Sequence, residues 1–197
     1  MEALLKNTLI VLIGFAGTGK YTIGRVLSQR TGAKLIDNHL INNPVFTAVN
    51  ADGLTRLPAP VWDKVKAIRA IVYETIREIS PPGLSFIFTL ELRESDPDAH
   101  RALHDLEELA AARNSLLVPI RLLCDVEELC RRVVHPARVE KLKDISSDNT
   151  RRKYAEHTVL EPQHENVRTI DVTAKSPDES ADAIMREIEL IGRSSYE

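Results

Sequence analysis

The sequence predicts an α/β fold in which helices cover a parallel sheet, and three observations support this. Short apolar segments recur along the chain, and segments with helical spacing or helix-capping residues lie between most of them and after the last. A glycine-rich turn joins the first apolar segment to the first helix. Such alternation favours parallel strands, with ligands bound at their carboxyl ends. The expected strands are 8–13, 33–36, 84–90, 115–123 and 167–172.

Each expected helix has a local signal for its face or its ends. Ile23, Val26 and Leu27 give the first helix one apolar face, and Gly32 is well placed to end it. Apolar residues from Val61 to Ile79 recur at helical spacing and predict one long helix. Acidic or hydroxyl capping residues open the three later helices. The expected helices are 20–30, 61–79, 97–113, 125–134 and 177–192.

Two polar regions give weaker signals. The stretch after the second strand contains Pro44, Pro58 and Pro60, so broken helix and loop are expected there. Residues 38–80 as a whole are the expected acceptor-binding insertion. Residues 135–166 are highly polar, and no helix or strand is predicted in them.

Composition excludes several classes of function. A chain of 197 residues with 43% hydrophobic residues is expected to form one globular domain, residues 1–197. The net charge of −3 gives no basic footprint for nucleic acid, and no apolar stretch is long enough for a membrane span. The first residues lack the architecture of a signal peptide. Cys124 and Cys130 fit neither a metal site nor a disulfide framework, so a cytoplasmic protein with reduced thiols is expected.

The strongest motif lies between the first strand and the first helix. Gly14-x-x-x-x-Gly19-Lys20 fits the phosphate-binding P-loop, in which glycines let backbone N–H groups converge on phosphate oxygens. The helix N-terminus adds a positive dipole, and Lys20 adds a charge that can bridge the β- and γ-phosphates. A nucleoside triphosphate site is therefore predicted. The expected cofactor-binding residues here are Gly14, Ala16, Gly17, Thr18, Gly19, Lys20, Tyr21 and Thr22.

Tyr21 is a departure from the motif. A Ser or Thr at this position normally gives its hydroxyl to Mg²⁺. A phenol is too long to reach the same point, and Thr22 is rotated by about 100° around the helix. Either phosphates, waters and Asp37 hold Mg²⁺, which is the favoured interpretation, or metal binding is weakened.

Asp37 ends the second strand at the expected phosphate edge. A carboxylate there can orient a metal-bound water or accept a substrate hydroxyl proton, although it can also form a simple Asx turn. Asn38, His39 and Asn42 form a polar cluster suited to a polar acceptor molecule. Glu91 and Arg93 follow the third strand and are also candidates for substrate binding. A purely structural role is equally well supported for both.

Residues 135–155 are interpreted as a mobile lid. Arg138 is expected to contact the transferring phosphoryl group, and Arg131 or Arg132 to make a second phosphate contact. A solvated helix end is the alternative for each of them. The later run Arg151 to Lys153 is interpreted as a solvated face, and the histidines show no zinc-site spacing.

With these residues in place, the chain resembles the shikimate- and gluconate-kinase-like branch of the nucleoside monophosphate kinase superfamily, which includes chloramphenicol phosphotransferase-like proteins. The resemblance rests on the P-loop, the strand-ending Asp37, the basic lid and the segment from Ile170 to Glu179. It implies a P-loop NTPase three-layer sandwich with strand order 2-3-1-4-5, ATP as donor, Mg²⁺ and a hydroxyl-bearing small molecule as acceptor. It also implies that the Thr173–Pro177 stretch flanks adenine, with Ala174, Lys175 and Pro177 as further cofactor-binding residues.

Two departures count against a true shikimate kinase. The Asp-x-Asp of that enzyme becomes Asp37-Asn38-His39, and the sequence Thr89 to Arg93 replaces its Gly-Gly-Gly run. The leading hypothesis is therefore an ATP-dependent kinase for another polar small molecule, acting as a monomer or homodimer. One alternative is a nucleotide-binding sensor with little turnover, which Tyr21 favours. A second, weaker alternative is a GTP-specific switch, and the absence of an Asn-Lys-x-Asp sequence that would read guanine counts against it.

Overall fold

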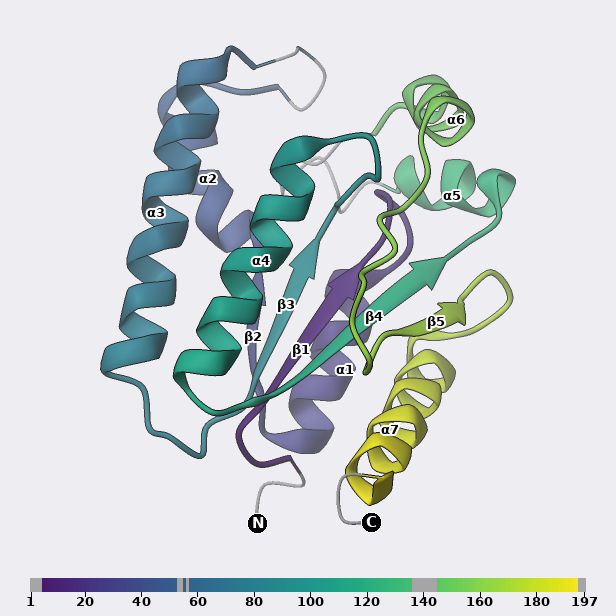
Figure 1. Ribbon diagram of the computed structural model, residues 1–197. Coiled ribbons are helices and arrows are strands. Elements are labelled where there is room, and N and C mark those ends of the chain that lie inside the picture. The colour runs from purple at the N-terminus through teal and green to yellow at the C-terminus, as the bar shows by residue number, and fades with distance from the viewer. Residues whose placement is uncertain (1–4, 53–54, 56, 136–144, 195–197) are drawn as a thin grey trace.

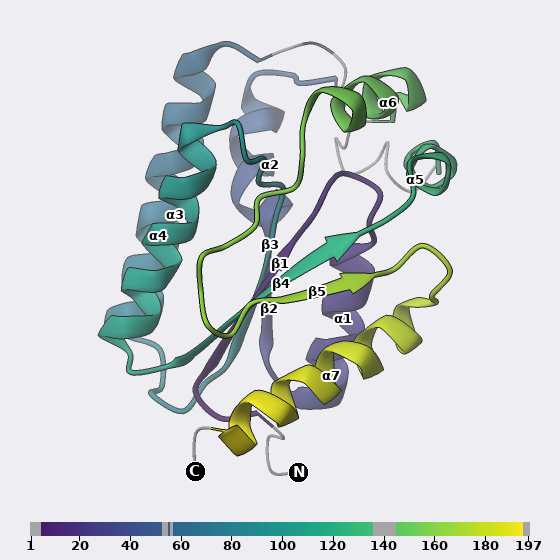
Figure 2. The ribbon, with the colours of Figure 1, turned by 45° about the vertical axis from the view of Figure 1, so that its right-hand side comes forward.

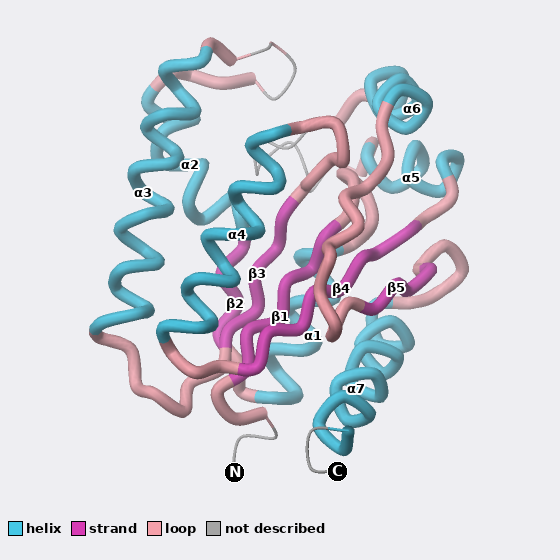
Figure 3. Tube along the Cα trace, viewed as in Figure 1, coloured by secondary structure: helices cyan, strands magenta, loops and turns pink. Residues whose placement is uncertain are grey.

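The computed structural model describes residues 5–52, 55, 57–135 and 145–194 and contains a five-stranded parallel sheet (Figures 1 and 3). The order β2-β3-β1-β4-β5 confirms the predicted α/β class and the strand order. All neighbouring strands are parallel, which places their carboxyl ends at one edge. The strands are β1 (Thr8–Ile13), β2 (Lys34–Asp37), β3 (Phe86–Leu90), β4 (Leu116–Leu123) and β5 (Arg168–Asp171).

The described helices form the outer layers. α1 and α7 cover one face of the sheet, α3 and α4 cover the other, and α5 and α6 lie beyond the carboxyl edge (Figures 1 and 2). None of the described helices is both long and apolar enough to cross a membrane. Their bounds are α1 (Lys20–Thr31), α2 (Asn38–Ala48), α3 (Ala59–Glu78), α4 (Pro97–Ala112), α5 (Val126–Val133), α6 (Ser147–Glu156) and α7 (Pro177–Ser194).

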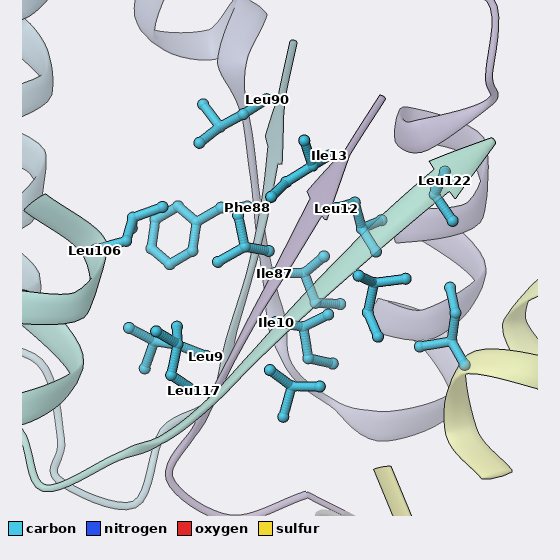
Figure 4. Close-up of a cluster of buried hydrophobic side chains, with 14 of the residues drawn as sticks. Leu9, Ile10, Leu12, Ile13, Ile87, Phe88, Leu90, Leu106, Leu117 and Leu122 are labelled. Atoms are coloured by element: carbon cyan, nitrogen blue, oxygen red, sulfur yellow. The ribbon is translucent and has the colours of Figure 1, made fainter. Parts of the chain in front are cut away.

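The core sits on both faces of the central strands. Leu9 to Ile13 are completely buried, because β1 has a strand on each side and helices above and below. This explains why its sequence is continuously apolar rather than alternating. Figure 4 shows Leu106 of α4 pointing toward Phe88 of β3. On the opposite face, a Cβ at Gly24 of α1 would come within 2.8 Å of Leu35, so this glycine permits close packing of α1 on the sheet.

Two regions differ from the sequence prediction. Residues 38–48 form one helix, α2, although Pro44 lies inside it, so the expectation of broken helix and loop is correct only for the loop that follows. Ile41 and Phe46 of α2 are buried in a second apolar cluster with Val61 and Val65 of α3. Tertiary packing therefore outweighs the local cost of the proline.

The second difference is α6, which the sequence analysis did not predict. Ser146 caps this helix, because its hydroxyl accepts a hydrogen bond from the backbone N–H of Asn149 (3.1 Å). Thr150 is its one buried residue, so the helix carries almost no apolar periodicity. The predicted lid, 135–155, includes this helix, whereas residues 136–144 lie outside the described part of the chain.

Candidate functional site

The predicted P-loop lies at the carboxyl end of β1. Each of its three glycines is required for a steric reason of its own. Gly17 (φ 92°) and Gly19 (φ 89°) adopt the left-handed backbone region that side chains rarely tolerate. A Cβ at Gly14 would lie 2.9 Å from both the backbone oxygen of Leu122 and the hydroxyl of Thr18. These constraints produce a tight loop that ends where α1 begins.

Lys20 folds back over this loop. Its Nζ donates hydrogen bonds to the backbone oxygens of Gly14 (2.6 Å) and Phe15 (2.8 Å), and lies 3.4 Å from the Thr18 hydroxyl. The ammonium group is thus held against the loop by neutral carbonyl groups. Phosphate oxygens are stronger partners for this cation, because the attraction between opposite charges is added to the hydrogen bond.

Two helices beyond the sheet contact the P-loop directly. A Cβ at Gly17 would lie 3.0 Å from Val133 and 3.1 Å from the Leu129 oxygen, both in α5. The rings of Phe15 and Tyr154 of α6 lie with their centres 5.9 Å apart. The two helices, which flank the central part of the predicted lid, therefore pack against the loop predicted to bind phosphate.

Asp37 lies at the same edge and is 5% exposed. Its Oδ1 accepts a hydrogen bond from the Thr89 hydroxyl (2.6 Å), and its Oδ2 accepts one from the His39 backbone N–H (3.4 Å). His39 Nδ1 is also 3.4 Å from Oδ2. Asp37 thus caps α2, which is the structural role considered for it, while its carboxylate lies at the same carboxyl edge of the sheet as the P-loop.

The polar cluster predicted to bind the acceptor lies on the first two turns of α2. Arg69 of α3, which the sequence analysis missed, donates a hydrogen bond to Asn38 Oδ1 (3.3 Å). Within the described residues, the buried Oδ1 of Asn42 and Nε of Arg69 have no hydrogen-bond partner. The signal was present in the sequence, because Arg69 follows Val65 by four residues and therefore lies on the inward face of α3.

Glu91 and Arg93 follow β3, and they have different surroundings. Glu91 Oε1 lies 3.8 Å from Nζ of Lys153, so this carboxylate faces α6. Arg93 instead pairs with Asp96 (3.5 Å) and forms an isolated backbone bridge with Val159. Like Arg69, Lys153 is a basic residue near this edge that the sequence analysis did not select as a site residue. It assigned Lys153 to a solvated face.

The two arginines of α5 also have different surroundings. The Arg131 side chain is 74% exposed and pairs with Glu128 (2.6 Å). Arg132 donates to the backbone oxygens of Val172 and Thr173 (3.1 Å each) and pairs with the same glutamate. Hydrogen bonds from Arg131 and Arg132 lower the pKa of Glu128 to about 2. Arg132 therefore joins α5 to the loop after β5, whereas Arg131 extends into solvent. Arg138 lies outside the described residues.

The loop after β5 is tied to the end of β4. The Thr173 hydroxyl donates to Asp171 (2.6 Å) and accepts from the backbone N–H of Asp125 (2.9 Å). Lys175 donates to the Asp171 backbone oxygen (2.7 Å), so the segment that contains Ala174, Lys175 and Pro177 is an ordered turn before α7. A cavity of about 460 Å³ lies beside it, lined by the P-loop, by the ends of β4 and β5, and by residues from Tyr154 to Val159.

The donor set at the edge fits Mg²⁺ bound mainly through nucleotide phosphates. Among the described residues, no group of three or more His, Cys, Asp or Glu side chains could enclose a metal ion. Asp37 could offer a carboxylate oxygen to such an ion through a bound water, and Mg²⁺ commonly uses one or two carboxylates, waters and substrate phosphates. Tyr21 is half-buried, with the Arg25 guanidinium 6.0 Å from its ring centre, and Thr22 is exposed.

Comparison with known proteins gives matches in structure alone. No protein-family model matches the chain, and no curated protein matches it in sequence. A gluconokinase from Sinorhizobium meliloti 1021 is similar in structure, with a TM-score of 0.64, 15% identity and 96% of each chain covered. A sugar kinase from Janibacter sp. HTCC2649 has a TM-score of 0.59 at 16% identity, covering 93% of this chain and 95% of its own.

A third solved structure is a shikimate kinase from Acinetobacter baumannii in complex with shikimate. Its TM-score is 0.52 at 17% identity, and 94% of each chain is covered. At these identities the likeness concerns architecture and not substrate. Over nearly the whole length of each chain, this protein shares the fold of these three solved kinase structures.

Proposed function

We propose that the protein is an ATP-dependent phosphotransferase that moves the γ-phosphoryl group to a hydroxyl of a polar small molecule. The observation that carries this proposal is the placement of Lys20 in the P-loop and Asp37 at the same sheet edge. Phosphoryl transfer requires mainly positioning and charge stabilisation, which a fixed loop and a buried carboxylate can supply. The kinase folds of the structural neighbours support the assignment.

In the proposed reaction, the acceptor hydroxyl oxygen bonds to the γ-phosphorus while the bond from that phosphorus to the β–γ bridging oxygen breaks. ADP leaves, and the hydroxyl proton passes to Asp37 or to solvent. Lys20 exchanges its carbonyl partners for β- and γ-phosphate oxygens. When bound, Mg²⁺ would neutralise phosphate charge, with Asp37 orienting one of its waters. Arg138 and Arg131 or Arg132 are the proposed lid contacts.

The acceptor is proposed to bind over the first two turns of α2. Asn38, His39 and Asn42 offer polar groups there, Glu91 lies on the side of α6, and Arg69 adds a half-buried cation. Adenine is proposed to lie against the turn from Ala174 to Pro177. Reduced cysteines and use of ATP fit the cytoplasm as the site of action.

The test is ADP release from ATP and Mg²⁺, with and without a pooled extract of small metabolites. We expect the extract to stimulate release by the wild type, and Lys20→Ala to abolish that stimulation. Lys34→Ala is the matched control, because this lysine is exposed at the amino end of β2. Stimulation that persists in Lys20→Ala would refute the assignment.

A second candidate is a nucleotide-binding sensor with little turnover, and Tyr21 favours it. Replacing the usual hydroxyl with a phenol removes a direct Mg²⁺ ligand while leaving the rest of the P-loop intact. Tyr21→Ser separates the two. A large gain in ATP turnover by this variant would favour the sensor, and a loss would favour a kinase adapted to the phenol.

A further inference from the structure

Thr89 is a buried hydroxyl residue inside an apolar strand. It is the fourth residue of β3, lies opposite Leu12 of β1 and Asp37 of β2, and is 2% exposed. The other four residues of the strand are Phe86, Ile87, Phe88 and Leu90. A buried hydroxyl group is costly unless it is hydrogen-bonded, so its partners define its role.

Both hydrogen-bonding functions of this hydroxyl are used at the carboxyl end of β2. Thr89 Oγ1 donates to Asp37 Oδ1 (2.6 Å) and accepts from the backbone N–H of Asn38 (3.1 Å). A hydroxyl has one proton, so the bond to Asp37 fixes its direction. Of the Asp37 contacts described above, this is the shortest, since those from His39 measure 3.4 Å.

These bonds connect Asp37 to β3, the strand that lies next to β1, from which the P-loop extends. β2 is an edge strand, so its last residue has a strand on one side alone. β3 pairs with both β2 and β1, and the residue after Thr89, Leu90, accepts a hydrogen bond from the backbone N–H of Gly14 (3.2 Å). Thr89 and Leu90 therefore tie the carboxylate and the first P-loop glycine to adjacent positions of one strand.

We propose that Thr89 is a positioning residue, whose hydroxyl holds the Asp37 carboxylate in the orientation that meets the Mg²⁺–nucleotide complex. The inference rests on the function proposed above. In most P-loops the hydroxyl directed toward the metal lies in the first turn of the helix, where this chain has Tyr21. Here a strand hydroxyl acts indirectly through Asp37, so orientation of the carboxylate does not depend on α1.

The test compares Thr89→Val, which keeps the shape and removes the hydroxyl, with Thr89→Ser, which keeps the hydroxyl. Thr8→Val is the matched control, because Thr8 is also buried in a central strand but lies at its opposite end. The readout is electron paramagnetic resonance of Mn²⁺ binding to the full-length protein with ADP. It requires no acceptor and no turnover.

We expect Thr89→Val to weaken Mn²⁺ binding in the ADP complex by about tenfold or more, a typical effect of losing a group that orients a ligand. Metal-free ADP affinity should change less than about twofold, because the P-loop is untouched. Thr89→Ser should restore most of the Mn²⁺ affinity. Thermal unfolding of each variant reports any separate loss of stability.

Equal Mn²⁺ affinities for Thr89→Val and Thr8→Val would overturn the inference while leaving the proposed function intact. A loss of metal-free ADP binding equal to the loss of Mn²⁺ binding would also overturn it, because that result indicates general damage to the site. Failure of the wild type to bind ADP at all would refute the proposed function, and the inference with it.

Discussion

Gly17 has a backbone conformation and a set of neighbours that together disfavour every other residue. Its φ is 92°, and a Cβ would meet α5 at 3.0 Å from Val133 and 3.1 Å from the Leu129 oxygen. Glycine at this position therefore serves the loop and also lets α5 approach it. The loop and α5 are consequently one packed unit.

Gly17→Ala should destabilise the protein by about 1–3 kcal/mol, because it combines left-handed strain with overpacking. It should also weaken ATP binding more than the stability loss alone explains. Gly83→Ala is the control, since a Cβ there meets nothing within 4 Å. Chemical denaturation and calorimetric ATP titration check both, and a Gly17→Ala variant as stable as Gly83→Ala would contradict the prediction.

The ionisation of Glu128 should make the stability of the folded protein depend on pH. Its pKa is about 2 in the folded state, because Arg131 and Arg132 donate hydrogen bonds to it, and 4.5 is its ordinary value. The depressed pKa means that its stabilising contribution is present above about pH 4.5 and is lost as the pH falls toward 2.

Glu128→Gln should therefore lower stability at neutral pH and flatten its decline between pH 4.5 and 2. We expect a loss of about 1 kcal/mol at pH 7, since water around the exposed Arg131 screens part of the pair. Urea denaturation at several pH values measures this, with the exposed Glu74→Gln as reference. Parallel pH profiles for the wild type and Glu128→Gln would show that the pair is not responsible.

At the scale of elements, one arginine organises the connections at the amino edge of the sheet. Arg113, at the end of α4, donates hydrogen bonds to five backbone oxygens near the end of α3 and the start of β3 and lies 5.4 Å from the Phe86 ring centre. Burial lowers its pKa. The accepting residues are Ile76, Ser80, Pro81, Pro82 and Leu84.

Arg113→Lys should cost about 2–3 kcal/mol of stability, because an ammonium group cannot reproduce the planar fork that reaches these carbonyl groups. Arg77→Lys on exposed α3 surface should change little. Thermal unfolding of both variants is the measurement. The carboxyl edge lies at the opposite end of the strands, so nucleotide affinity of folded Arg113→Lys should stay near that of the wild type.

At the scale of the whole molecule, ligand binding should be visible as stability. A ligand that binds only the folded state at a hundred times its dissociation constant adds about 2.7 kcal/mol. ATP with Mg²⁺ should therefore raise the melting temperature of the wild type by several degrees, and Lys20→Ala should lose that shift. An equal shift in Lys20→Ala would place the nucleotide elsewhere on the protein.

The sequence predicted the elements whose signals are local. All five strands were found because their residues are apolar and bounded by turn residues, and the P-loop because its glycines and lysine are contiguous. α2 was expected only as broken helix and α6 was not predicted, because tertiary contacts or capping, and not periodicity, define them.

Parts of the candidate site could not be predicted because they depend on contacts between distant segments. In the sequence, Thr89 is one residue of an apolar segment that predicts a buried strand. Its hydrogen-bond partner, Asp37, is 52 residues away, so no local pattern indicates their contact. Arg69 of α3 contacts Asn38 of the neighbouring helix α2, which precedes it by 31 residues. The strand order, which places β2 beside β3 and so brings Asp37 next to Thr89, was expected from resemblance to a family and not from any pattern in the residues.

The central position of β1 has a consequence for how the chain is made. β1 ends at Ile13, but its second neighbour, β4, is complete only at Leu123. At about 5–20 residues per second, a ribosome would finish β4 roughly 5–20 s after β1. During that interval the most apolar strand of the protein has no complete sheet to join. Nascent chains should therefore recruit chaperones soon after β1 leaves the exit tunnel and release them once β4 emerges.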